Sequence, residues 1–82
     1  MVKKADSKRS YIVIARRGAK VVEHTACRTL SIAKGDGMDM WCAYNRTTVT
    51  IYSFSGENPK ALEEVGTIGR NGRNELKFFK SV

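Results

Sequence analysis

Two segments rich in β-branched and aromatic residues most constrain the fold of this chain. Residues 11–15 read Tyr-Ile-Val-Ile-Ala and place apolar side chains on both faces of a strand, as the centre of a sheet requires. Residues 47–54 alternate β-branched and aromatic side chains along a second strand. Both segments are too short and too strongly β-forming for a helical core, so they predict a sheet as the main element of the fold.

Further strand and turn signals fill the first half of the chain. A turn at 16–19 predicts that the strand at 20–27 runs antiparallel to the first one. Residues 30–33 indicate a short strand or a bend. The Lys-Gly-Asp-Gly sequence at 34–37 is typical of a tight hairpin turn, and the alternating side chains of 38–44 predict a strand after it.

One helix is predicted, over residues 59–65. Asn58 is a favoured N-cap, and Pro59 suits the first helical position because its missing N–H costs nothing there. Gly66 suits the C-terminal stop. A helix of two turns is not stable alone, so we expect it to pack on the sheet.

The end of the chain predicts a second hairpin. Asn71-Gly72 is a strong turn signal, and the residues from 75 to 80 form a closing strand. Residues 69–72 also resemble the GxxG loop with which KH modules clamp a nucleic-acid backbone. A hairpin with a turn at Asn71-Gly72 accounts for the same residues and is preferred, because the segment that follows is typical of a strand and not of a helix.

These elements predict an α+β fold with a mostly antiparallel sheet, either open or curled into a small barrel, and one short helix near 59–65. At 82 residues the chain has room for one domain. Residues 1–9 are charged and nearly free of large apolar groups, which predicts a flexible basic tail. Residues 10–82 form the single β-rich domain. No apolar run approaches the roughly 20 residues of a membrane span.

Charge is the property that most favours a binding partner. The net charge is +7, and it is divided into +7 for residues 1–34, −3 for 35–69 and +3 for 70–82. If both basic ends meet in space, they form a positive face that suits a polyanion. The sequence therefore predicts a small nucleic-acid-binding module, regulatory or accessory, which would bind DNA or RNA through cations at its two hairpins: Arg16, Arg17, Lys20, Arg70, Arg73 and Lys77. Exposed aromatic side chains beside these cations could stack on bases.

The alternative is a small protein-binding inhibitor or adaptor, of the kind that phages and mobile elements encode. It would use Met38, Met40 and Trp41 as an apolar anchor on an acidic protein surface. A homodimer formed through a sheet edge, and a subunit of a larger assembly, are also compatible with the sequence. Whether Trp41 lies in the core is left open by the alternation.

The chain offers little for catalysis, so we do not expect an enzyme. Cys27 and Cys42 lie in apolar segments, where buried, reduced thiols are expected, and these point to a cytoplasmic protein. His24 is the only histidine, so neither a zinc site nor any other metal site is predicted. No phosphate loop or dinucleotide motif is present, and no cofactor is expected.

Overall fold

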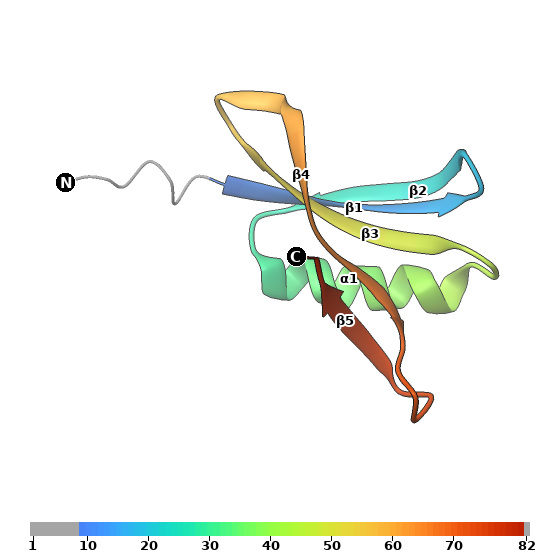
Figure 1. The fold of residues 1–82 in the computed structure, drawn as a ribbon. Coiled ribbons are helices and arrows are strands. Elements are labelled where there is room, and N and C mark those ends of the chain that lie inside the picture. The colour runs from blue at the N-terminus through green and yellow to red at the C-terminus, as the bar shows by residue number, and fades with distance from the viewer. Residues whose placement is uncertain (1–8, 82) are drawn as a thin grey trace.

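The two strongest strand segments lie side by side at the centre of a five-stranded antiparallel sheet (Figure 1). The computed structural model describes residues 9–81. Its strands are β1 (Arg9–Arg17), β2 (Lys20–Cys27), β3 (Thr48–Ser55), β4 (Asn58–Arg70) and β5 (Leu76–Lys80), in the sheet order β2-β1-β3-β4-β5. The predicted α+β class and antiparallel sheet are confirmed. The sheet is not closed into a barrel, so β2 and β5 form its edges.

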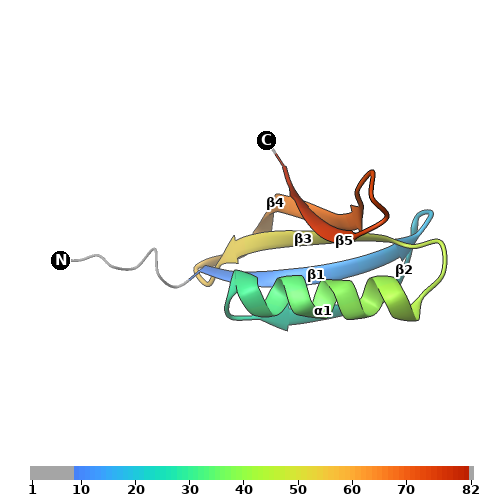
Figure 2. The same ribbon diagram turned by 90° about the horizontal axis from the view of Figure 1, so that it is seen from below.

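One helix, α1 (Leu30–Ala43), covers one face of the sheet (Figure 2). Its buried residues Ala33, Gly37 and Met40 follow a helical spacing and face the strands. The fully buried Val13 and Ile51, which are paired across β1 and β3, lie in the core under this helix. The opposite face of the sheet carries no second layer among the described residues.

The prediction for residues 30–44 is wrong, because one helix replaces the expected bend, hairpin turn and strand. Thr29 caps the helix: its side-chain oxygen accepts a hydrogen bond from the backbone N–H of Ile32 at 3.2 Å. Gly35 and Gly37 lower helix propensity and therefore indicated a turn. Gly37 is tolerated because α1 lies close to the sheet there: a Cβ at this position would be 2.9 Å from Cγ1 of Ile68.

The helix predicted over 59–65 is also wrong, because this segment belongs to β4. β4 pairs with β3 through Ser55↔Asn58 and Ser53↔Glu63, with irregularities in the register between. The capping signals of Asn58 and Pro59 are local, and a two-turn helix gains little by itself. Pairing along β3 instead gives the backbone a ladder of hydrogen bonds, so tertiary context overrides the local preference.

The flexible tail predicted for residues 1–9 lies outside the described residues, except for Arg9. Arg9 is the first residue of β1, and its Nη2 donates to Oγ of Ser53 at 2.8 Å and pairs with Oε1 of Glu63 at 3.0 Å. In the described part of the chain, α1 is too short and too polar to cross a bilayer.

Gly35→Ala is expected to raise the free energy of unfolding by about 0.5–1 kcal/mol. Gly35 lies inside α1, and a Cβ there would meet nothing within 4 Å, so only the gain in helix propensity remains. Urea denaturation followed by circular dichroism measures the change. Gly37→Ala is the matched control, since its Cβ must displace Ile68 and the gain should be reduced or reversed. A destabilised Gly35→Ala protein would contradict the helix assigned to 30–43.

Candidate functional site

Three loops that are far apart in the sequence lie at the same end of the sheet. The register places Arg16 opposite Thr48 and Val49 opposite Ile68, so the end of β1, the start of β3 and the end of β4 coincide. The β1–β2 turn, the α1–β3 loop and the β4–β5 turn therefore lie at the same end of the sheet (Figures 1 and 2), with the β4–β5 turn set apart from the other two in Figure 1.

All six residues predicted to contact phosphate lie at or next to this end. We call the following set the cationic end: Arg16, Arg17, Lys20, Arg46, Arg70, Arg73 and Lys77. Sequence reasoning missed Arg46, which lies in the acidic middle of the chain. Only the return of α1 to this end of the sheet brings the Arg46 loop there. Its backbone has φ 59°, a left-handed conformation that is uncommon for a residue with a side chain.

Neutral groups hold three of these guanidinium groups in place. Nη1 of Arg16 donates to the hydroxyl of Tyr52 at 2.9 Å. Nε and Nη2 of Arg17 both donate to the carbonyl oxygen of Asn45, at 3.2 and 3.0 Å. These contacts orient the two arginines and tie β1 to the face of β3 and to the α1–β3 loop.

Arg70 is held in a similar way, on the face of the sheet that α1 covers. Its guanidinium carbon lies 4.8 Å from the centre of the Trp41 ring, a cation–π contact, and its Nη1 donates to the carbonyl oxygen of Asn74 at 2.8 Å. Arg16 makes a looser contact with the Tyr52 ring, at 5.5 Å. None of these partners carries a negative charge.

Within residues 9–81, the one salt bridge joins Arg9 to Glu63, at the opposite end of the sheet. The carboxylate in the β4–β5 turn, Glu75, accepts instead from the side-chain amide of Asn71 at 3.0 Å. The arginines at the cationic end are thus positioned without being neutralised, and most of their N–H donors remain free for a ligand.

Asn71 organises the turn that carries Arg73. Its side-chain oxygen accepts from the backbone N–H groups of Arg73 and Glu75, at 2.8 and 3.0 Å. The predicted second hairpin is confirmed, but its turn is longer than two residues. The left-handed position is Asn74, with φ 65°, and not Gly72. The GxxG segment therefore lies at the end of β4 and in the turn of a hairpin.

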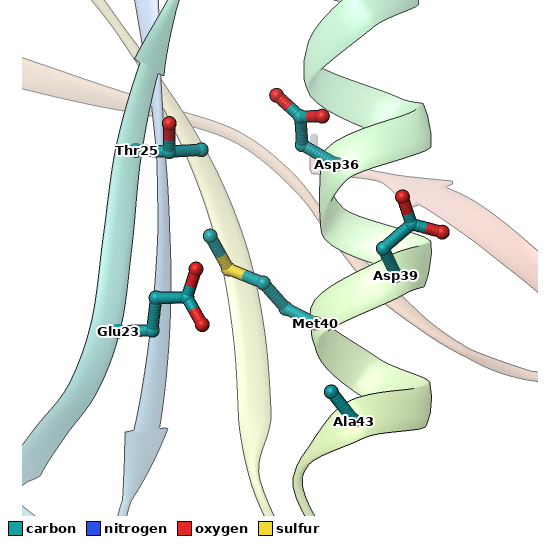
Figure 3. Close-up of a pocket in the computed structure, with 6 residues that line it drawn as sticks. All are labelled: Glu23, Thr25, Asp36, Asp39, Met40 and Ala43. Atoms are coloured by element: carbon teal, nitrogen blue, oxygen red, sulfur yellow. The ribbon is translucent and has the colours of Figure 1, made fainter.

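Three acidic residues line a pocket of about 290 Å³ between β2 and α1. Glu23 and Thr25 line it from the strand, and Asp36, Asp39 and Met40 line it from the helix (Figure 3). Despite these carboxylates, no set of three His, Cys, Asp or Glu side chains in residues 9–81 is grouped closely enough to hold a metal ion.

Two titratable groups beside this pocket have altered pKa values. Burial, a hydrogen bond to Oδ2 of Asp36 at 3.3 Å and the charge of that carboxylate raise the pKa of the Cys27 thiol to about 11. Cys27 is therefore protonated at neutral pH. The Tyr44 hydroxyl donates to Oε1 of Glu23 at 2.6 Å, which raises the pKa of Tyr44. Both cysteines are free, but Cys42 is exposed, so the expected burial holds for Cys27 alone.

The apolar anchor of the alternative function is mostly inside the protein. Met40 is 4% exposed and belongs to the core. Met38 and Trp41 are partly buried and packed against that core, and the Trp41 ring is covered by Arg70. The helix that replaces the expected strand at 38–44 accounts for this, because it turns these side chains toward the sheet.

Comparisons with protein-family models, with curated proteins and with solved structures each gave no match for this chain. The function must therefore be argued from the geometry of the site.

Proposed function

We propose that this chain is a small nucleic-acid-binding module that contacts phosphates through its cationic end. The observation that carries the proposal is that Arg16, Arg17 and Arg70 are held by hydroxyl, carbonyl and aromatic partners, with no carboxylate of residues 9–81 within ion-pair distance. Such groups are oriented in advance and keep their full charge for a polyanion. The two free cysteines suit a reducing compartment, so we place the protein in the cytoplasm.

The size of the cationic end fits a nucleic-acid strand. Five strands lie about 4.8 Å apart, so the end of the sheet is roughly 19 Å wide. Phosphates of one strand of B-DNA follow each other at about 3.4 Å along the axis. The cationic end therefore spans about five base-pair steps of a duplex. One carboxylate of the pocket between β2 and α1, Glu23, pairs with Ala15 next to Arg16, and it accepts a hydrogen bond from the Tyr44 hydroxyl.

A salt titration tests the proposal. Fluorescence anisotropy would measure binding of the full chain to labelled 20-nucleotide single strands and 20-base-pair duplexes of DNA and RNA, from 50 to 500 mM salt. If four to six phosphates are contacted, log affinity should fall by about 3 to 5 per tenfold increase in salt. Absence of binding to every probe at 50 mM salt would refute the proposed function.

A further inference from the structure

The face of the sheet turned away from α1 is defined by the register. We call it the open face, and among the paired residues that it presents are Arg16, Val21, Tyr52, Glu64, Lys77 and Phe79. Their neighbours along the strands, such as Val13 and Ile51, point into the core under the helix. α1 lies on the other side of the sheet (Figure 2), and no helix of the described residues covers the open face.

Phe79 is the most unusual residue of the open face. It is 43% exposed although it is a large apolar side chain on a paired strand. Its ring lies beside Gly69: a Cβ built there would be 3.6 Å from Cε2 of Phe79. Gly69 lies nearer to the β4–β5 turn than Thr67, the residue opposite Phe79, so the ring is directed toward the cationic end. The absence of a side chain on Gly69 leaves room for the ring there.

Two cations share this face with the ring. Lys77 is exposed, pairs with Gly69 and lies two residues before Phe79, about 7 Å away along β5. Arg16 comes from β1, three strands away across the sheet, which is about 14 Å at the usual strand spacing. The exposed ring thus has one positive side chain beside it and a second one farther across the same face.

The side chain of Arg16 also covers the centre of the open face. Its hydrogen bond to the Tyr52 hydroxyl crosses the row of Ile14 and Thr50, which the register places between them. Ile14 is 8% exposed and Thr50 is 5% exposed although no helix covers them. The Arg16–Tyr52 pair therefore acts as a cover for the centre of the face, and one guanidinium N–H is used while the others remain free.

The charge of the open face selects an anionic ligand. Glu64, opposite Tyr52, is its one acidic residue among the described strand pairs, and Oε2 of Glu64 accepts from the Ser81 hydroxyl at 2.6 Å. Glu23, by contrast, lies on the other side of the sheet and lines the acidic pocket in Figure 3. The open face thus carries Arg16 and Lys77 against one carboxylate, and it also carries the exposed ring.

We infer that the open face binds single-stranded nucleic acid, with a base stacked on Phe79, the adjoining phosphate bound by Lys77 and a phosphate farther along the strand bound by Arg16. The inference rests on the proposed function and gives it a strand preference. A single strand offers unpaired bases whose faces can stack on the ring, whereas a duplex keeps those faces inside its own stack. The cationic end alone would bind both forms by charge.

Phe79→Leu tests this inference, because leucine keeps an apolar side chain but has no aromatic face. Affinity for a labelled 15-nucleotide single strand should fall about 5- to 150-fold, the equivalent of about 1–3 kcal/mol per stacked base. Affinity for the same strand annealed to its complement, and the salt slope of both, should not change. Phe79→Tyr is the matched control and should keep the wild-type affinity.

The possible failures are distinct. If wild-type protein binds both probes with a steep salt slope and Phe79→Leu changes neither affinity, or lowers both equally, the stacking inference is overturned and the proposed function stands. If wild-type protein binds neither probe, both fail together. Sedimentation without nucleic acid gives a further result: a dimer that Phe79→Leu dissociates would assign the open face to a second copy of the chain, and would also overturn the inference.

Discussion

Replacing Arg16, Arg17 and Arg70 together with glutamine should lower nucleic-acid affinity on the order of 1000-fold at 50 mM salt. Each lost phosphate contact removes about 0.7 to 0.9 from the salt slope, so three lost contacts should flatten the slope by about 2 to 3. The difference is largest at low salt and vanishes toward 1 M, because the effect is electrostatic. Anisotropy titrations of both proteins at several salt concentrations measure it.

A matched variant distinguishes the contribution of the cationic end to affinity from the contribution of net charge. Arg28, Lys60 and Lys80 are exposed and lie away from the cationic end, so changing these three to glutamine removes the same charge. This control should reduce affinity far less, since its cations would contact fewer phosphates. Both variants keep the basic residues that precede Arg9, so a difference in affinity between them does not come from those residues. Equal losses in the two variants would show that binding depends on total charge and not on the cationic end.

Gly66→Ala should destabilise the fold by about 3 kcal/mol, a large part of the roughly 4–12 kcal/mol expected for a domain of this size. A Cβ on Gly66 would overlap the Phe79 carbonyl oxygen and would lie only 2.6 Å from Cε1 of Phe78, so both contacts are steric clashes. The carbonyl cannot move without disturbing the pairing of β4 with β5. Urea unfolding should show a midpoint lower by about 2–3 M.

Gly72→Ala is the control for this prediction. Gly72 lies in the β4–β5 turn with ordinary φ, and a Cβ there would meet nothing within 4 Å. Its unfolding free energy should stay within about 0.5 kcal/mol of the wild-type value. Equal stability of the two variants would mean that β5 does not approach β4 as closely as described.

Local patterns predicted β1, β2 and β3 well, but they missed α1 and assigned a helix to part of β4. The segments 11–15, 20–27 and 47–54 lie within or match β1, β2 and β3 to within a residue, because β-branched alternation is a local property. The segment 30–43 was missed because Gly35 and Gly37 weaken its helical pattern. The close approach to Ile68 that makes Gly37 necessary is a contact with β4, distant in the sequence.

Some residues of the candidate site could be predicted from the sequence and others could not. Arg16, Arg17, Arg70 and Arg73 could be selected from the sequence, because turn residues next to basic clusters are recognised locally. Phe79 could not, since the pattern of β5 does not say which of its faces α1 covers. Its partner on the other face, Phe78, is partly buried and has Lys34 over its ring at 4.7 Å.

The sequence by itself determined β1, β2, β3 and β5, the turns after β1 and β4, and the excess of positive charge, since each depends on neighbouring residues. The tertiary structure decided where the helix lies, that Arg46 joins the other cations, and that three arginines meet neutral partners instead of carboxylates. It also decided that Phe79 stays exposed. These features depend on strand order and on the face that α1 covers, and both are set by contacts between residues far apart in the chain.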